Sequence, residues 1–168
     1  QGRLLIETKP TLGSTFTLLL PIQTESPSVK AANIDAHTAE GFANRGVLVV
    51  DDEALLRRVL GTILSAAGFK VFTASDGSEA LATVKEMGTA INLVILDITM
   101  PGLSGIETRT QIRQQSPALP IIMSSGHPEE TLDRLEGWSP DRDGFIQKPY
   151  RNQALLAAIE SLLFTNRT

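Results

Sequence analysis

Residues 47–58 read VLVVDDEALLRR, in which four apolar residues lead directly into two adjacent aspartates and then into a helix-forming segment. Four consecutive apolar positions predict a strand that is covered on both faces, as in the parallel sheets of α/β proteins. Ligands of such sheets bind beyond the carboxyl ends of the strands. Asp51 and Asp52 therefore mark one part of a predicted site.

Three later apolar runs also end in polar residues. Asp97 follows LVIL at 93–96, Ser125 closes the strand that begins IIM at 121–123, and Lys148 follows GFIQ at 144–147. The carboxyl ends of parallel strands meet at one edge of the sheet, so we expect these side chains to lie close together. Three acids, one hydroxyl and one ammonium in that place suit a divalent cation beside a phosphoryl group.

Residues 46–168 alternate predicted strands and helices. An apolar stripe at Leu56, Leu60, Ile63 and Ala67 is typical of a helix that lies on a sheet, and Gly68 is placed to end that helix. Five strand–helix units with right-handed crossovers predict a doubly wound parallel sheet. We expect strands near 47–51, 70–74, 92–97, 120–124 and 144–148, and helices near 53–67, 77–87, 104–115, 128–137 and 151–164.

The N-terminal part of the chain differs in composition. Residues 1–21 contain two β-like runs around Lys9–Gly13, which reads as a turn, so a hairpin is expected. Residues 22–45 lack a sustained period and predict a linker, with one helical turn near 38–44. The chain starts at Gln1 inside a strand-like pattern, so we expect a fragment of a longer protein.

Composition excludes several classes of protein. The 168 residues contain no cysteine and only two histidines, which excludes disulfides and thiolate sites and argues against zinc. A bound metal is thus expected to be a hard cation on oxygen ligands. The net charge of −4 argues against a nucleic-acid surface, and no apolar run reaches the length of a membrane span.

Residues 46–166 resemble the receiver domain of two-component response regulators. Val47–Arg58 looks like the first strand, the acidic pair and the helix start of that family. Asp97–Gly105, DITMPGLSG, fits the phosphoacceptor loop D-x-x-M-P-x-x-x-G. The strand at 121–126 and the segment Phe145-Ile-Gln-Lys148-Pro149 fit the later motifs. The resemblance implies a flavodoxin-like fold, with five parallel strands in the order 2-1-3-4-5 and the predicted β-hairpin as an N-terminal extension.

Residues 2–21 resemble, over a short stretch, the last strands of the ATP-binding domain of histidine kinases. Gly13-Ser14-Thr15-Phe16 and Leu18-Leu19-Leu20-Pro21 supply the pattern loosely, with Ser14 inserted into its Gly-Thr step. The order of kinase tail at 1–21, linker at 22–45 and receiver at 46–168 is similar to a hybrid sensor histidine kinase. This fragment itself is not expected to be an enzyme, whereas the parent chain is expected to be a histidine kinase.

The receiver resemblance implies a role for each pocket residue. Asp97 is the expected phosphoacceptor, because a carboxylate can attack the phosphorus of a phosphohistidine and form an acyl phosphate. Asp52, Asp97 and the Thr99 carbonyl are implied ligands of Mg²⁺ or Mn²⁺, with Asp51 acting through water. The alternative for Asp51 and Asp52 is capping of the following helix. Lys148 is expected to pair with Asp97 and then with the phosphoryl oxygens.

Further roles follow from the same resemblance. Ser125 is the expected hydroxyl partner of the phosphoryl group, although the family more often has Thr, and Ser124 is the alternative one position earlier. Phe145 is the expected switch aromatic, or else an ordinary core residue. Thr99 and His127 are expected to flank the path of the hydrolytic water; the alternative for His127 is an exposed loop residue. Trp138 lies in a stretch that departs from the family pattern and is either a partner contact or a cover over the core.

The expected function is phosphoacceptance by Asp97 in a two-component phosphorelay. The expected partners are the kinase domain of the same chain and a histidine phosphotransfer protein, without nucleic acid or direct membrane contact. A cytoplasmic location is expected, which is compatible with a membrane-anchored parent. The main alternative is a receiver-like interaction module that acts without phosphorylation. A metal-dependent phosphatase would require an acid where Thr99 stands, and flavin binding would require a phosphate-binding loop after the first strand.

Overall fold

The computed structural model describes residues 3–9, 13–19, 42–126 and 137–164. The chain divides into two compact units, residues 1–31 and residues 32–168. The helix expected near 128–137 and the linker up to residue 41 fall almost entirely outside the described residues. Within the described residues, each helix is too short or too polar to cross a bilayer.

The N-terminal unit contains the predicted hairpin. Strands β1 (Arg3–Lys9) and β2 (Gly13–Leu19) pair antiparallel. The register places Leu4 opposite Leu18 and Ile6 opposite Phe16, so these four apolar side chains share one face of the hairpin. All of them are more than half exposed. The hairpin thus has one face of exposed apolar side chains.

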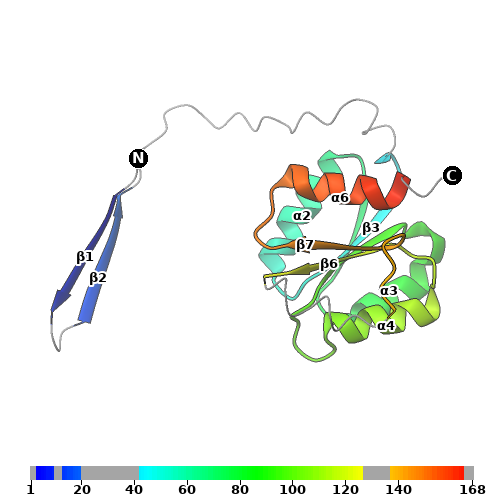
Figure 1. Cartoon of the computed structure of the whole chain (residues 1–168), viewed down its shortest axis with the longest axis horizontal. Helices are drawn as coiled ribbons and strands as arrows, with labels where there is room; N and C mark the ends of the chain where they lie inside the picture. Colours follow the sequence, from blue (N-terminus) through cyan, green and yellow to red (C-terminus); the bar gives the residue numbers. More distant parts are fainter. Residues whose placement is uncertain (1–2, 10–12, 20–41, 127–136, 165–168) are drawn as a thin grey trace. The chain divides into compact units, whose positions relative to one another are not determined.

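The second unit is built on a five-stranded parallel sheet in the order β4-β3-β5-β6-β7 (Figure 1). In chain order this is the predicted arrangement 2-1-3-4-5, which confirms the doubly wound, flavodoxin-like fold. The strands are β3 (Gly46–Val50), β4 (Lys70–Ala74), β5 (Leu93–Asp97), β6 (Ile121–Ser125) and β7 (Asp143–Gln147). The central strands β3, β5 and β6 are buried throughout, because helices cover both faces of the sheet.

Helices lie on both faces of this sheet, as Figure 1 shows, with α2 and α6 on one face and α3 and α4 on the other. They are α2 (Ala54–Ala66), α3 (Gly77–Met87), α4 (Gly105–Gln115) and α6 (Asn152–Phe164), and the short 3₁₀ helix η1 (Gly88–Ala90) follows α3. Each face has its own buried cluster of apolar side chains. The sheet therefore presents alternating side chains of each strand to two separate cores.

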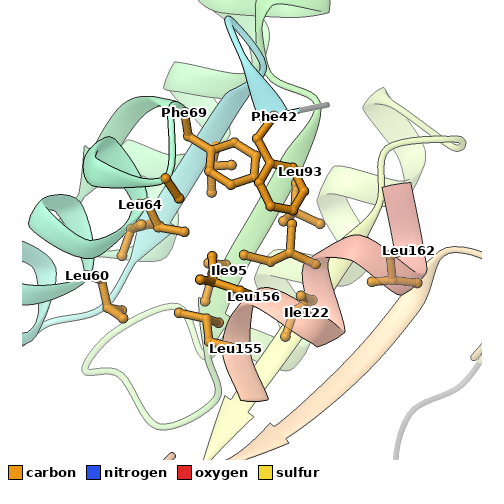
Figure 2. Packing of buried hydrophobic residues seen from close by; sticks show 14 of the residues in the cluster. Phe42, Leu60, Leu64, Phe69, Leu93, Ile95, Ile122, Leu155, Leu156 and Leu162 are labelled. Atoms are coloured by element: carbon orange, nitrogen blue, oxygen red, sulfur yellow. The ribbon is translucent and has the colours of Figure 1, made fainter. Parts of the chain in front are cut away.

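The core between the sheet, α2 and α6 contains Leu60 and Leu64 of α2 and Leu155 of α6 (Figure 2). In the predicted stripe of α2, Leu60 and Ala67 are buried, but Leu64 is more deeply buried than Ile63. Gly68 follows the helix with a φ of +98° and its amide donates to the Ser65 carbonyl, which ends the helix as expected.

Phe42 lies within the range 22–45 that the sequence predicts as linker, yet its side chain is fully buried. Its ring stacks on Phe69 with a centroid distance of 4.5 Å, and both rings belong to the core shown in Figure 2. The core of the second unit therefore begins earlier than the first strand of the sheet.

Candidate functional site

Three carboxylates meet at the carboxyl edge of the sheet. Asp51 and Asp52 follow β3, and Asp97 is the last residue of β5. One carboxylate oxygen of each lies within 4.8 Å of the others. Asp51 and Asp97 are buried, whereas Asp52 is exposed. The central strands β3 and β5 are neighbours, so their ends bring these acids together.

Lys148 joins two of these acids. It directly follows β7, and its Nζ lies 2.8 Å from Asp51 Oδ2 and 3.1 Å from Asp97 Oδ1. The lysine side chain is 23% exposed. The peptide bond between Lys148 and Pro149 is cis. One cation thus contacts two buried carboxylates, while the third carboxylate faces solvent.

Burial dominates the electrostatics of Asp97. Burial raises the pKa of the Asp97 carboxyl, and its contacts with Lys148 and the Thr99 amide offset this only partly. Burial alone would lower the pKa of Lys148, but its hydrogen bonds to Asp51 and Asp97 outweigh it and raise that pKa. A second cation near the three acids would relieve the remaining repulsion.

The acidic pair does not cap the following helix. The N-cap of α2 is Glu53, which has no side-chain capping bond. Instead, Asp51 Oδ1 accepts from the Glu53 amide at 2.9 Å, and its carbonyl accepts from Arg57 at 2.6 Å. The carboxylate of Asp51 is thereby held toward Lys148, and Asp52 is left free to face solvent. Arg57 is a support of the pocket that the sequence did not predict.

The loop after Asp97 is held close to the strand end. Ser104 caps α4 through a capping box with Glu107, so the helix starts at Gly105. A Cβ atom on Gly105 would lie 2.1 Å from the Asp97 carbonyl, so no other residue fits. The exposed Thr99 lies in this loop, and its backbone amide contacts Asp97. The glycine therefore fixes the start of α4 against the end of β5.

Ser124 and Ser125 face opposite sides of the sheet. Neighbouring residues of β6 alternate between the two cores: Met123 packs with α3 and α4, and Ile122 packs with α2 and α6. Ser125 thus shares its face with Phe145 of β7, which packs on the α3 and α4 core. Ser124 faces the side of Tyr150, whose pKa is raised by burial. The predicted pairing of Ser125 with Phe145 is compatible with this alternation.

His127 lies outside the described residues. Trp138 packs against the core beneath α3 and α4 and is partly buried, in keeping with a cover over that core. Asp51, Asp52, Asp97 and Lys148 converge, with Thr99 in the adjoining loop. Carboxylate oxygens and a backbone carbonyl are the donors that Mg²⁺ prefers, so these residues fit such an ion.

Residues 47–160 match the response regulator receiver domain. The chain belongs to this family. It is 41% identical over 117 residues to the probable transcriptional regulator ycf27 of Porphyridium aerugineum, a match that covers 70% of this chain and 47% of the relative. The receiver domain thus spans about half the length of the curated relatives that it matches.

Solved receiver structures are similar as well. The response regulator TrrA from Thermotoga maritima, in complex with Mg²⁺ and BeF, aligns with a TM-score of 0.64 at 33% identity, over 71% of this chain and 99% of that one. The receiver domain of the hybrid histidine kinase CckA aligns with a TM-score of 0.60 at 29% identity, over 70% and 98%. Receiver domains are the phosphoacceptors of two-component systems and bind Mg²⁺ at an acidic pocket.

Proposed function

We propose that Asp97 of this receiver accepts a phosphoryl group from a phosphohistidine. The observation that carries the proposal is the meeting of three carboxylates within 4.8 Å, with Lys148 bonded to two of them. An oxygen of Asp97 attacks the phosphorus, the P–N bond breaks, and the histidine nitrogen leaves with the electron pair. The product is an aspartyl phosphate, and Lys148 moves from pairing with the carboxylate to pairing with the phosphoryl oxygens.

Asp52, Asp97 and the Thr99 carbonyl are the proposed ligands of Mg²⁺, with Asp51 acting through water. Mn²⁺ has a similar preference for oxygen ligands and is the alternative ion. A bound divalent ion would neutralise charge on the transferring phosphoryl group. The surroundings of Asp97 support this assignment, because burial and the neighbouring Asp51 raise its pKa despite Lys148, and a bound cation would favour the charged carboxylate.

Ser125 and Phe145 are the proposed switch residues. They lie on neighbouring strands and face the same core. When the Ser125 hydroxyl moves toward the phosphoryl group, the space that it leaves admits the Phe145 ring. Thr99 and His127 are the proposed residues beside the hydrolytic water, and they set the lifetime of the phosphoryl group.

An apolar groove beside the pocket supports a helical phosphodonor as partner. Leu56, Val59 and Ile63 of α2 line this groove together with Pro149 and Tyr150. Lys148 belongs to the same lining, so the groove is continuous with the site. A histidine-bearing helix that lies in this groove would present its phosphohistidine to Asp97. The proposed donors are a histidine kinase domain of the same chain and a histidine phosphotransfer protein.

The parent protein is proposed to be a hybrid sensor histidine kinase, whose receiver lies in the cytoplasm. Three features support this: the kinase-like motif of residues 2–21, the hairpin that those residues form, and the similarity to the CckA receiver. The second candidate is a transcriptional response regulator, which is what the curated relatives with similar receiver domains are. Sequencing of the gene beyond both ends of this chain distinguishes a kinase core from a DNA-binding domain.

Phosphoacceptance is tested by incubating the protein with acetyl phosphate, with and without Mg²⁺, and mapping the modified residue by mass spectrometry. The proposal predicts one phosphoryl group on Asp97 that depends on Mg²⁺. The receiver-like interaction module predicts no labelling under either condition. Labelling of another residue at full stoichiometry would contradict the proposed role of Asp97.

A further inference from the structure

An arginine lies in the interior between α4 and β7. The side chain of Arg109 is 2% exposed, and that of Asp143, its partner on β7, is fully buried. Arg109 donates from Nε to Asp143 Oδ1 at 3.1 Å and from Nη2 to Oδ2 at 2.7 Å. This bidentate geometry fixes both the distance and the orientation of the two side chains.

The Asp143 carboxylate has further donors. Arg113, one turn after Arg109 on α4, donates to Oδ1 at 2.6 Å, and the Ser139 amide donates to Oδ2 at 2.9 Å. Arg109 also donates to the Gly137 carbonyl at 3.0 Å. These contacts hold the pKa of Asp143 below its usual value despite burial. In this arginine cluster, defined as Arg109, Arg113 and Asp143, the Asp143 carboxylate is thus well supplied with donors.

This cluster connects helix α4, whose first residue packs on Asp97, to strand β7, which leads into Lys148. Helix α4 starts at Gly105, which packs on the carbonyl of Asp97. Strand β7 starts at Asp143, and the residue after its end is Lys148. The Arg109–Asp143 ion pair therefore closes a ring of contacts. From Asp97 the ring passes through Gly105 and α4 to Arg109, and then to Asp143. It continues along β7 to Lys148, whose Nζ lies 3.1 Å from Asp97 Oδ1.

Strand β7 also pairs with β6 and places Ile146 and Phe145 on the two cores. Within the described residues it lies at the edge of the sheet and pairs with β6 alone. An edge strand lacks backbone hydrogen bonds on one side, so its position depends more on its side chains. Its two ends are held by charged contacts, the arginine cluster at Asp143 and the acidic pocket at Lys148.

We infer that Arg109 and Asp143 are positioning residues, which hold β7 against α4 and thereby place Lys148 beside Asp97. The inference rests on the proposed role of Asp97 as phosphoacceptor. The described hydrogen bonds of Arg109 go to Asp143 and to the Gly137 carbonyl, so its inferred effect on the reaction passes along β7 to Lys148. A positioning role therefore requires Lys148 for its effect on the rate, whereas a general contribution to stability does not.

The test is a double-mutant cycle with Arg109→Met and Lys148→Ala, measured as the initial rate of Asp97 phosphorylation by acetyl phosphate with Mg²⁺. Methionine keeps the apolar stem, and Arg113 still pairs with Asp143, so the variant is expected to fold. Arg109→Met should lower the rate by about threefold or more when Lys148 is present, and should leave it unchanged in the Lys148→Ala background. The melting temperature should fall equally in both backgrounds.

The matched control is Ile112→Val, which removes a methyl group from the same helix and core without touching Asp143. It should lower the melting temperature but leave the rate unchanged in both backgrounds. If Arg109→Met does not fold, Arg109→Lys replaces it, since lysine keeps the charge but loses the bidentate contact. Arg109→Lys should then lower the phosphorylation rate only when Lys148 is present.

The positioning role would be overturned if Arg109→Met lowered the phosphorylation rate by the same factor with Lys148 present and with Lys148→Ala. It would also be overturned if neither Arg109 variant lowered the rate. Failure of the proposed function gives a different result. In that case the wild-type protein is not labelled on Asp97, or Lys148→Ala has the wild-type rate, and there is then no lysine function for Arg109 to support.

Discussion

The two ends of β7 place buried carboxylates in opposite electrostatic surroundings. At the acidic pocket, the ammonium group of Lys148 pairs with both Asp51 and Asp97, while Asp52 faces solvent. At the arginine cluster, a single carboxylate, that of Asp143, forms ion pairs with both Arg109 and Arg113. Burial raises the pKa of Asp97, whereas the arginine contacts of Asp143 overcome burial and lower its pKa.

The difference shows that the partners of a buried acid, rather than its burial, decide whether it favours the folded state. The donors around Asp143 satisfy its charge within the protein, which suits a structural role. The described donors of Asp97 are fewer, Lys148 and the Thr99 amide, which suits a group that must receive a divalent cation and a phosphoryl group. Each of the following changes acts mainly on one of these two regions.

The largest expected effect is the loss of phosphorylation in Asp97→Asn. The amide cannot form the acyl phosphate, and removal of one charge relieves repulsion among the pocket acids, so stability should stay level or rise. Mass spectrometry after treatment with acetyl phosphate and thermal unfolding measure the two outcomes. Persistent labelling at the wild-type stoichiometry would refute the assignment of Asp97.

The corresponding change at the arginine cluster should be strongly destabilising. Asp143→Ala leaves two buried guanidinium groups without their carboxylate, and such a loss costs about 3–5 kcal/mol. Urea unfolding, with Asp97→Asn measured in parallel, gives the comparison. Similar free energies of unfolding for the two variants would show that the two acids do not differ as proposed.

The two acids should also give opposite dependences on pH in metal-free buffer. The pKa of Asp143 is lowered from 3.8, so its stabilisation is present above that pH and is lost as pH falls through the lowered value. The pKa of Asp97 is raised from 3.8, so its protonated form favours folding and this benefit is lost as pH rises through the raised value.

Urea unfolding across the acidic range therefore should show that the free energy of unfolding of Asp97→Asn increases relative to that of the wild type as pH rises above 3.8. Asp143→Asn should fall behind the wild type in free energy of unfolding over a lower interval, as pH rises from the lowered pKa of Asp143 toward 3.8. If the free energies of unfolding of the wild type and both variants changed with pH in parallel, the opposite pKa shifts of Asp97 and Asp143 would be contradicted.

Mg²⁺ should stabilise the protein through the acidic pocket alone. A site with few carboxylates is expected to bind in the range of about 0.1–10 mM. At ten times the dissociation constant, linkage adds about 1.4 kcal/mol to the free energy of unfolding. Thermal unfolding with Mg²⁺ and then with EDTA measures this gain and its reversal. Asp52→Ala should abolish the gain and Arg109→Met should retain it; equal shifts for wild type and Asp52→Ala would refute the site.

The smallest expected effect concerns the uncharged positions beside the pocket. Thr99→Asn combined with His127→Glu should change the rate of autodephosphorylation several-fold, a barrier difference of about 1 kcal/mol, with Mg²⁺ affinity nearly constant. Asparagine and glutamate can orient a water molecule in ways that threonine and histidine do not. Identical decay of the phosphorylated double mutant and wild type would remove both residues from the water path.

The sequence predicted the sheet and the acidic pocket because both depend on local patterns. Apolar runs such as 47–50 are long enough to identify buried strands, and the polar residue after each strand shares the same edge of the sheet. Asp51, Asp97 and Lys148 could therefore be placed together without any knowledge of the helices.

The arginine cluster escaped prediction because Arg109 lies within a helix, where a charged residue usually faces solvent, and not at a strand end as Asp51, Asp97 and Lys148 do. Its one local signal is that Arg109 lies on the same helix face as the buried Gly105 and Ile112, where an apolar residue is the norm. Phe42 was missed for a similar reason: a lone aromatic in a segment without period gives no indication of the distant ring, Phe69, on which it stacks.

Trp138 is the single tryptophan of the chain, and its ring lies 5.7 Å from the Arg109 guanidinium carbon. Its intrinsic fluorescence consequently comes from one place, a ring that packs against the core beneath α3 and α4. A shift of Arg109 or of β7 changes the charge beside the indole and thus its emission. The protein therefore carries its own optical probe, and rapid mixing with a phosphodonor can be followed in real time without an attached dye.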